Sequence, residues 1–408
     1  RFMGALGLYA SLRPIKGALP IAIQARAEGF DGLILPAENA REAAVVNNLN
    51  VYGVKHIAEV ISHFNGGDQL QPTIVDTRRE FFDHQQQVSF DFSEVKWQEK
   101  VKRALEVAAA GGHNLIMVGS PGSGKSMMAK RMPGILPPFT LSESLETTKI
   151  YSVAGKLGVN SMLLTQRPFR SPHHSISSAA LVGGGTYPQP GEISLAHNGV
   201  LFLDELPEFK RSVLEVMRQP LEDREVTISR TKFSITYPAS FMLVASMHPS
   251  PSGYFNDPDA PMTSSPAEMQ RYLSKISGPL LDRIDIHIEV NPVPFEKLAQ
   301  REKAESSTAI RERVIRAREI QTQRFAQYEH IHYNAQMSSQ QIGKYCHVEA
   351  SSLAMLKKAM ERLNLSARAY DRILKVARTI ADLEGAETIQ EHHIGEAIQY
   401  RSLDREGW

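Results

Sequence analysis

Apolar runs and helical repeats alternate along the middle of the chain, and this pattern predicts its main elements. A helical spacing of apolar residues at 97–110 comes before four short apolar runs of the kind that form buried strands. These runs are residues 114–119, 199–204, 240–246 and 284–290. Strands that alternate with helices favour a sheet of parallel strands. Residues 93–295 are therefore expected to form an α/β domain.

The N-terminal part has a mixed pattern. In residues 1–64, helices are expected at 19–27 and 56–64 and a buried strand at 32–36. Residues 65–92 are rich in turn-forming residues and glutamine, which predicts a linker.

Helical patterns alone follow the α/β region. Helices are expected at residues 296–330, 338–346, 349–363, 366–383 and 390–401. Residues 296–408 are therefore predicted to be an all-helical domain.

Composition limits the class of protein. The chain has 408 residues with 46 basic and 45 acidic side chains, which give a net charge of +1. A disordered chain and a polybasic nucleic-acid coat are excluded, so any contact with nucleic acid must come from local patches. Cys346 is the single cysteine, which excludes an intramolecular disulfide and a thiolate zinc site within one chain.

The chain lacks the patterns of membrane and exported proteins. No apolar run reaches about 18 residues, and residues 1–30 carry charges without a long apolar stretch. We expect a cytoplasmic protein without membrane contact. Because the chain begins at Arg1, we also expect a further N-terminal piece.

The strongest motif is a phosphate-binding loop between an expected strand and an expected helix. The pattern G-x-x-x-x-G-K-[ST] is complete at Gly119, Ser120, Pro121, Gly122, Ser123, Gly124, Lys125 and Ser126. Glycines allow backbone N–H groups to surround phosphate oxygens. Lys125 would reach the β- and γ-phosphates, and the Ser126 hydroxyl would bind magnesium. The alternative is a glycine-rich turn that matches by chance.

A second motif supplies two acids. The apolar run 199–203 ends at Asp204 and Glu205. Asp204 can hold magnesium while Glu205 polarises the attacking water. Together the two motifs predict a nucleoside triphosphatase with ATP and Mg²⁺ as cofactors.

Seven segments resemble a known family over nearly the whole chain. They are residues 111–125, 167–174, 181–185, 190–194, 200–209, 278–285 and 365–370. They resemble the magnesium-chelatase-like AAA+ proteins of the ComM and YifB group. The resemblance implies an α/β AAA+ P-loop core with a helical C-terminal lid domain. It also implies a homo-oligomer, in the form of a hexamer, that acts as an ATP-driven DNA motor.

The resemblance assigns two arginines. Arg283 would be an arginine finger that enters the neighbouring subunit's site and stabilises charge on the γ-phosphate. Its alternative is a salt bridge with Asp282 or Asp285. Arg368 would be the second sensor, which couples nucleotide state to the position of the lid, and its alternative is a solvated surface arginine.

Two positions near the expected site depart from the family pattern. His248 stands where the first sensor is normally an asparagine, which predicts slow or pH-sensitive hydrolysis between pH 6 and 8. A histidine merely packed beside the site is the alternative. Trp97 replaces a glycine, and it could stack on adenine or belong to the core.

Two further comparisons within the resemblance exclude other chemistries. Four cysteines of many relatives are replaced here, so no zinc is expected; the replacements are Ser250, Ser252, Met262 and Ser264. Residues 1–64 resemble the latter half of the α+β Lon protease fold. Pro20 falls at the position of the catalytic lysine, and the serine-bearing half lies outside the chain, so proteolysis is not expected.

Candidate contacts with nucleic acid lie before the sensor strand. Residues 226–237 alternate apolar and polar side chains around Arg230 and Lys232, which predicts a hairpin with a basic tip. In related AAA+ helicases a hairpin here points into the central channel, and the glycine-rich residues 181–191 would be a second pore loop. Basic tips and an aromatic suit tracking of a nucleic-acid backbone. An ordinary solvated hairpin is the alternative.

Other polar clusters are expected to be structural. The pairs His173–His174 and His392–His393 have no evident third metal ligand nearby. The basic stripe alternates with acids and is expected to be a solvated helix face; it comprises Arg311, Arg313, Arg316 and Arg318.

The leading hypothesis is an oligomeric AAA+ ATPase that acts on DNA, with branch migration in DNA uptake and recombination as the implied role. A magnesium-chelatase-type subunit or a protein-remodelling ATPase is the second hypothesis. A third is an ATP-binding clamp with weak hydrolysis, which His248 and Trp97 keep open.

Overall fold

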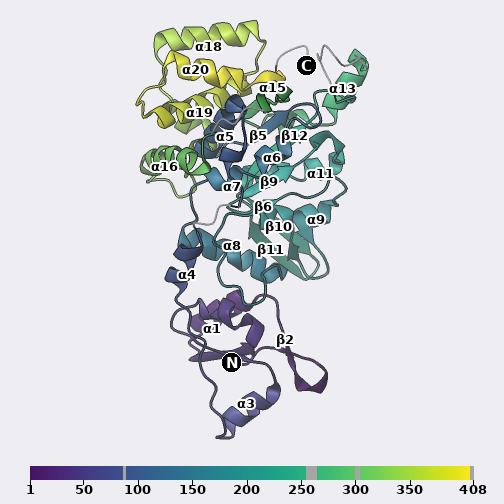
Figure 1. The fold of residues 1–408 in the computed structure, drawn as a ribbon, viewed down its shortest axis with the longest axis vertical. Helices are drawn as coiled ribbons and strands as arrows, with labels where there is room; N and C mark the ends of the chain where they lie inside the picture. Colours follow the sequence, from purple (N-terminus) through teal and green to yellow (C-terminus); the bar gives the residue numbers. More distant parts are fainter. Residues whose placement is uncertain (86–88, 254–263, 299–303, 405–408) are drawn as a thin grey trace.

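The computed structural model describes residues 1–85, 89–253, 264–298 and 304–404. Its centre is a parallel five-stranded sheet with the strand order β13-β5-β12-β9-β6 (Figure 1). The strands are β5 (Leu115–Val118), β6 (Phe169–Arg170), β9 (Val200–Leu203), β12 (Met242–Met247) and β13 (Ile286–Glu289). The four strands expected from apolar runs are confirmed. The short edge strand β6 was not predicted.

Helices cover both faces of the sheet. They are α5 (Glu99–Gly111), α6 (Lys125–Ala129), α7 (Met132–Ile135), α8 (Leu141–Ala154), α9 (Ser178–Val182), α10 (Glu192–Leu195), α11 (Arg211–Glu215), α12 (Arg218–Asp223), α13 (Pro266–Ser274) and α14 (Gly278–Leu281). In β5, Leu115 and Met117 pack into one hydrophobic core, and Ile116 and Val118 pack into another. Successive side chains of a strand point to opposite faces, so burial of both faces explains the continuous apolar runs.

The C-terminal region is helical, as expected. It contains α15 (Phe295–Leu298), α16 (Ser307–Arg324), α17 (Ser339–Tyr345), α18 (Ala350–Arg362), α19 (Ala367–Glu384) and α20 (Glu391–Gln399). Both α16 and α19 pack against α5, and their buried residues belong to the same core as one face of the sheet. A single helix over residues 296–330 was the wrong prediction. The Ser306 side chain accepts the N–H of Ala309 and starts a new helix at Ser307.

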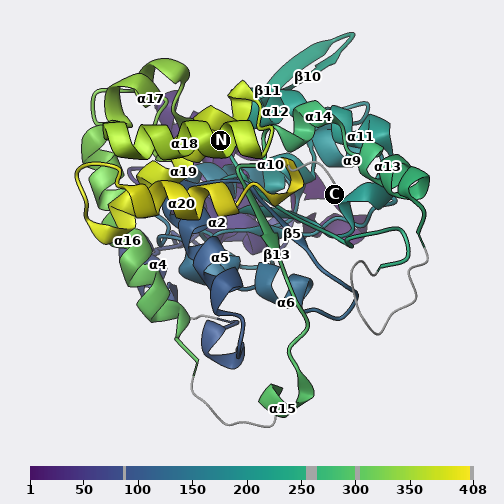
Figure 2. The same ribbon diagram turned by 90° about the horizontal axis from the view of Figure 1, so that it is seen from above.

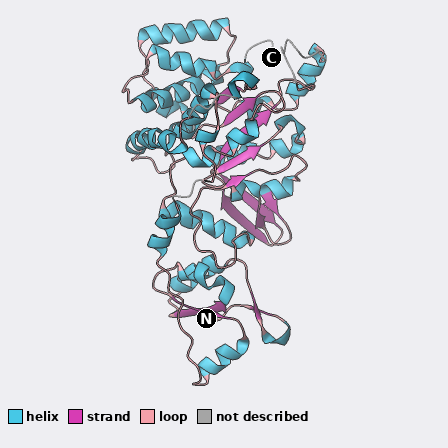
Figure 3. Cartoon of the chain, viewed as in Figure 1, coloured by secondary structure: helices cyan, strands magenta, loops and turns pink. Residues whose placement is uncertain are grey.

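The N-terminal region is a small mixed unit at the opposite end of the molecule from the C-terminal helices (Figures 1 and 3). It contains β1 (Ala5–Leu6), β2 (Leu12–Arg13), α1 (Ala18–Ala27), β3 (Gly32–Pro36), α2 (Ala40–Ala44), β4 (Asn50–Val54) and α3 (Ile57–Phe64). The expected helices and strand are confirmed, and Pro20 lies in the first turn of α1. The likeness to the Lon protease fold stays a prediction.

The stretch expected to be a linker contains a helix, α4 (Thr77–His84). Its Phe81 is buried in one cluster with Phe139 and Leu163 of the sheet region. This contact ties the N-terminal region to the centre of the molecule, so residues 65–92 are only partly irregular.

The expected basic-tipped hairpin is present and extends outward from the body (Figure 2). It consists of β10 (Glu225–Arg230) and β11 (Phe233–Pro238), and a shorter hairpin of β7 (Gly183–Gly184) and β8 (Gln189–Pro190) lies beside it. Among the described residues, no helix has both the length and the apolar composition that crossing a membrane requires.

The basic stripe on α16 is not simply a solvated face. Arg311 donates to the carbonyl oxygen of Gly134 at 2.8 Å, and Arg318 donates to that of Ala109 at 2.7 Å. Arg313 pairs with Glu106 at 2.6 Å. These arginines attach α16 to the core, and of the four only Arg316 is exposed.

Candidate functional site

The phosphate-binding loop connects β5 to α6, which begins at Lys125. Gly122 and Gly124 have φ angles of 78° and 94°, which residues with a side chain rarely adopt. At Gly119, a Cβ would lie 2.3 Å from the carbonyl oxygen of Val290. The path of the loop therefore requires glycine at all three positions.

Lys125 is folded over the loop. Its Nζ donates to the carbonyl oxygens of Gly119 at 2.6 Å and Ser120 at 2.9 Å. Burial lowers the pKa of Lys125, while the carboxylates of Asp204 and Glu205 act in the opposite direction. A phosphate group can take the place of these carbonyl oxygens as the partner of the ammonium. The other loop positions differ in exposure: Ser123 is buried, Gly124 is half-buried, and Pro121 and Gly122 are exposed.

The two acids follow β9 at the same edge of the sheet as the loop. Ser126 Oγ donates to Asp204 Oδ2 at 3.2 Å. A hydroxyl beside a carboxylate offers the oxygen ligands that Mg²⁺ prefers, so this pair fits the ion. Glu205 has a φ of 53°, in the left-handed region where non-glycine residues are strained.

Ser246 joins the two acids, and it is not among the site residues predicted from the sequence. It lies on β12, which pairs with both β5 and β9. Its Oγ donates to Asp204 Oδ1 and accepts the backbone N–H of Glu205 at 3.1 Å. Ser246 is fully buried. A polar residue within the apolar run of β12 was the signal that could have revealed it.

His248 follows β12 at this edge, where the first sensor is expected. Tyr272 Oη donates to the backbone carbonyl oxygen of His248 at 3.1 Å. Burial, followed by the charge of Lys125, lowers the pKa of the imidazole. The imidazole is therefore neutral at pH 7, and it takes up a proton only toward the acidic end of the pH 6 to 8 range considered above.

We expect ATP hydrolysis to decline below about pH 6.5, the ordinary pKa of histidine. Because the pKa of His248 is lowered, the ring is neutral above that pH, and protonation in more acidic solution places a second positive charge near Lys125. A His248→Asn protein should not show this decline. Steady-state turnover of both proteins between pH 5 and 8 tests the expectation, and an identical decline in the two proteins would argue against a direct role.

A cavity of about 560 Å³ lies at the opposite end of the parallel strands from the phosphate-binding loop, where the strands begin. Its lining includes Asn114, Phe241 and Asp285, which come directly before β5, β12 and β13. The phosphate-binding loop, by contrast, comes directly after β5. Parallel strands begin at one edge and end at the other, so roughly 13 Å of strand separates the cavity from the loop.

Both arginines assigned by resemblance line this cavity, and each has an acidic partner. Arg283 pairs with Glu222, and Arg368 pairs with Asp282. The alternative partners expected for Arg283 are therefore not the ones it has. The pKa of Arg283 is lowered by burial and by three neighbouring cations, Arg218, Arg372 and Arg368.

A buried polar network connects this edge to the C-terminal helices. His113 Nδ1 lies 2.7 Å from Asp285 Oδ2, and its Nε2 lies 2.7 Å from Oγ1 of Thr379 on α19. Arg372, also on α19, donates to Asp285 Oδ1 at 3.1 Å. Burial alone would raise the pKa of Asp285, but Arg372 and His113 hold it well below its usual range.

Three of the four positions that carry cysteine in many relatives are serines here, and these serines lie together. Ser250 Oγ is 2.9 Å from Ser252 Oγ, which in turn accepts from Ser264 Oγ at 3.3 Å. Met262, the fourth position, lies outside the described residues. Neutral hydroxyls lack the thiolate charge of a structural zinc site, so this cluster is held by hydrogen bonds.

Trp97 precedes α5 and does not open it. Its φ is 64°, which explains why the family pattern has a glycine there. Lys297 Nζ lies 5.2 Å from the centre of its ring, and the buried Nε1 has no hydrogen-bond partner among the described residues. Trp97 is half-buried, and stacking on adenine stays a prediction.

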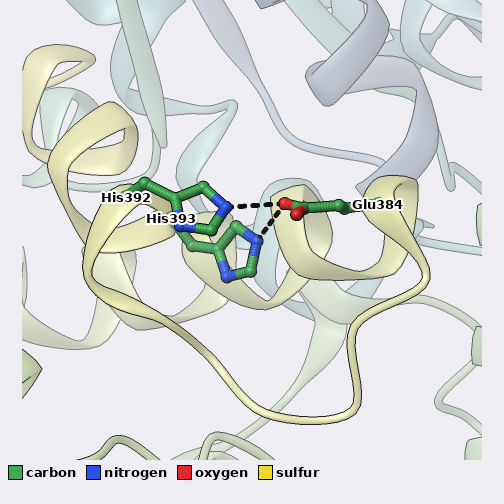
Figure 4. A group of neighbouring side chains, drawn as sticks. All are labelled: Glu384, His392 and His393. Atoms are coloured by element: carbon green, nitrogen blue, oxygen red, sulfur yellow. Dashed lines mark hydrogen bonds and ion pairs between the residues drawn. The ribbon is translucent and has the colours of Figure 1, made fainter.

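One of the histidine pairs does have a third candidate ligand. Figure 4 shows both histidines in contact with the carboxylate of Glu384. One oxygen of this carboxylate lies 2.7 Å from His392 Nε2 and 2.5 Å from His393 Nε2. However, the backbone N–H of Gln390 donates to His393 Nδ1 at 2.9 Å, so Nε2 must carry the proton of the neutral ring. A metal ligand needs that nitrogen free, and the contacts therefore support a helix cap. In the other pair, His173 Nδ1 lies 2.8 Å from the Oγ atom of Ser175, a contact that suits a structural role.

Arg230 and Lys232 lie at the exposed end of the β10–β11 hairpin. Arg230 forms the last pair of the ladder with Phe233, and Lys232 lies in the turn. The predicted basic tip is therefore present, and its contacts with nucleic acid stay a proposal.

The parallel sheet, the complete loop and the acids beside it define an α/β protein with a P-loop of the AAA+ type. Three family models cover most of the chain. Magnesium chelatase, subunit ChlI, matches residues 91–298, its C-terminal model matches 304–401, and a further model of subunit ChlI matches 1–39. The chain belongs to this magnesium-chelatase-like family, in the group that contains ComM and YifB.

Two of the similar proteins match nearly the whole chain, and a third matches part of it. The competence protein ComM of Haemophilus influenzae is 43% identical over 406 residues, which are 99% of this chain and 78% of ComM. The uncharacterized protein YifB of Escherichia coli is 41% identical over 99% of this chain and 77% of YifB. The magnesium-chelatase 38 kDa subunit of Cereibacter sphaeroides is 25% identical over 39% of this chain and 53% of that subunit.

Proposed function

We propose that this chain is an ATP-hydrolysing AAA+ motor that works as a homo-oligomer, in the form of a hexamer, and acts on DNA in the cytoplasm. The observation that carries the proposal is the placement of Arg283 and Arg368 at the opposite edge of the sheet from the chain's own phosphate-binding loop. Cations so placed can serve a second subunit. The ATPase site is then complete only between two subunits.

The geometry of the residues at the loop supports the following roles. ATP supplies the bond that is cleaved, and Mg²⁺, when bound, supplies positive charge that neutralises the phosphates. Lys125 would bind phosphate oxygens, and Ser126 with Asp204 would hold the ion. Glu205 orients and polarises the attacking water, and Ser246 keeps both acids in place. His248 contacts the γ-phosphate or the water as a neutral ring.

Arg283 completes the site from the neighbouring subunit. Its guanidinium stabilises the charge that develops on the γ-phosphate during cleavage. To do so it must leave Glu222, which is 61% exposed and therefore free to turn toward water. Arg368, beside it in the same cavity, is proposed as the second sensor, which couples the state of that neighbouring nucleotide to the position of the lid.

DNA is proposed as the substrate of the motor because of the exposed basic tip formed by Arg230 and Lys232. The chain is similar to ComM, which is named a competence protein, and we propose branch migration during DNA uptake and recombination as its role. A chelatase-type or protein-remodelling ATPase without a DNA role is the second candidate, favoured by the match to the ChlI models.

We expect single-stranded or branched DNA to stimulate ATP hydrolysis, and more salt to weaken the stimulation, because contacts with phosphates release counterions. Arg230→Glu together with Lys232→Glu should remove the stimulation and spare basal turnover. Steady-state hydrolysis with and without DNA at low and moderate salt measures both effects. The matched control is Lys357→Glu with Lys358→Glu, an exposed pair on α18. Hydrolysis that is indifferent to DNA would favour the second candidate.

A further inference from the structure

A cavity of about 360 Å³ lies where three regions of the chain meet. This size is typical of pockets that hold small molecules, and such pockets often lie between domains. The stretch after α4 contributes Gln85 and Phe90, the core contributes Lys130 and residues on to Phe169, and α16 contributes Arg311. Gln85 Nε2 donates to the carbonyl oxygen of Phe139 at 2.7 Å, which fixes one wall of the cavity to another.

The walls of this cavity are largely apolar. They include three phenylalanine rings and three proline rings, from Phe90, Phe139, Phe169, Pro133, Pro137 and Pro138. Apolar walls favour a ligand with an apolar body, because its burial removes apolar surface from water. The phenylalanine rings also offer faces and edges against which an aromatic ring can pack.

Three cations line the same cavity, and none of its described lining residues is acidic. The charge of Arg167 is already balanced, because this side chain pairs at 2.7 Å with Glu143, which lies outside the lining. Arg311 donates from Nε to the carbonyl oxygen of Gly134 at 2.8 Å, a neutral partner. Within the described part of the chain, neither Arg311 nor Lys130 forms an ion pair. The cavity therefore carries positive charge that its own side chains do not balance.

The surroundings of Arg311 make an unbalanced charge costly. Burial lowers the pKa of Arg311, and the positive charge of Arg167 lowers it further. A guanidinium nevertheless stays protonated at neutral pH. A half-buried charge without a counter-charge costs free energy, and a bound anion would offset that cost.

We propose that this cavity binds a small organic anion, in which a carboxylate, sulfonate or phosphate group is joined to an aromatic or aliphatic body. The anionic group contacts Arg311 and Lys130, and the body packs against the phenylalanine and proline side chains. A cationic ligand is repelled by the same charges. A neutral apolar ligand would bury the charge of Arg311 further without balancing it.

The cavity is separate from the phosphate-binding loop. Lys130 directly follows α6, whose first residue is Lys125 of that loop. At the rise of an α-helix, roughly 7 Å of helix lies between the two lysines. A ligand in the cavity therefore leaves the loop open to ATP, and the site does not depend on the proposed action on DNA.

Two fluorescent dyes that differ by one charged group test the site. Anilinonaphthalene sulfonate carries an anionic group on an aromatic body, and phenylnaphthylamine is the same body without the sulfonate. In fluorescence titrations, the wild type should bind the sulfonate dye at one tight site per chain and bind the neutral dye more weakly. Arg311→Gln should weaken binding of the sulfonate dye by about tenfold, and Lys130→Gln, at an exposed position, by about threefold. Binding of the neutral dye should change by less than about twofold.

A matched variant separates loss of charge from loss of structure. Arg311→Lys also loses the guanidinium that contacts Gly134, but it keeps the positive charge, so its affinity for the sulfonate dye should stay within about threefold of the wild type. Arg316→Gln removes an exposed cation from the same helix and should have no effect. Thermal unfolding shows whether each variant keeps its fold.

Each outcome bears on the proposal. Selective loss of the sulfonate dye in a folded Arg311→Gln protein would support it. Equal affinities of the wild type for the two dyes, or equal losses of both dyes in this variant, would overturn recognition of the anionic group. Displacement of the sulfonate dye by ATP with Mg²⁺ would place the dye in the phosphate-binding loop, which would overturn the new site and leave the proposed ATPase in place.

Discussion

An Arg283→Ala protein should bind ATP as the wild type does and lose turnover by about a thousandfold or more, the effect of removing an arginine finger. The reason is its position. Arg283 comes just before β13, at the edge of the sheet where strands begin, whereas the phosphate-binding loop comes where β5 ends. In the proposed assembly its guanidinium acts on a nucleotide held by another subunit, so its loss should leave ATP binding by its own loop unchanged.

Mixing two inactive proteins tests the action between subunits. Arg283→Ala keeps an intact phosphate-binding loop, and Lys125→Ala keeps an intact finger. In randomly mixed rings about one interface in four combines the two intact halves, so turnover should return to roughly that share of the wild type. Arg316→Ala is the matched control, because this arginine is exposed on α16 and should leave turnover unchanged. Mixtures that stay inactive would contradict the shared site.

A Ser246→Ala protein should hydrolyse ATP about 10–100-fold more slowly, the usual cost of losing a residue that orients a metal ligand. Ser246 Oγ donates to Asp204 and accepts the backbone N–H of Glu205. Its removal therefore frees the Asp204 carboxylate and leaves the backbone N–H of Glu205 without a hydrogen-bond partner. The protein should also need more Mg²⁺ for half-maximal turnover, and a Mg²⁺ titration of steady-state hydrolysis measures this.

The control for Ser246 is Ser194→Ala, which removes a hydroxyl that is equally buried but lies on α10. Thermal unfolding of both variants shows whether the fold is kept. If Ser246→Ala unfolds at the same temperature as Ser194→Ala and retains the turnover and Mg²⁺ dependence of the wild type, then Ser246 has no part in placing the acids.

The strands and the phosphate-binding loop were predictable because their signals are local. A strand buried on both faces, such as β5, must be apolar throughout, and the loop requires glycines at fixed positions. The boundaries that failed depend on distant contacts. The helix α4 forms where Phe81 can pack with Phe139 and Leu163, which are far away in the sequence.

The rest of the candidate site depends on which strands are neighbours. Ser246 reaches both acids only because β12 lies between β5 and β9. Arg368 lies on α19 in the expected helical region, and its pairing with Asp282, which brings it beside Arg283, depends on contacts distant in the sequence. The left-handed conformation of Trp97 also escaped prediction, since the residue type gives no sign of it.

The network of His113, Asp285 and Thr379 has a mechanical meaning for a ring. Asp285 lies two residues after Arg283, and Thr379 lies on the same helix as Arg368 and Arg372. The segment that carries Arg283 and Asp285 is thus rigidly connected to α19. In the proposed assembly, a neighbouring subunit that moves the Arg283 segment also moves α19. The C-terminal helices therefore respond to the nucleotide state of the adjacent subunit.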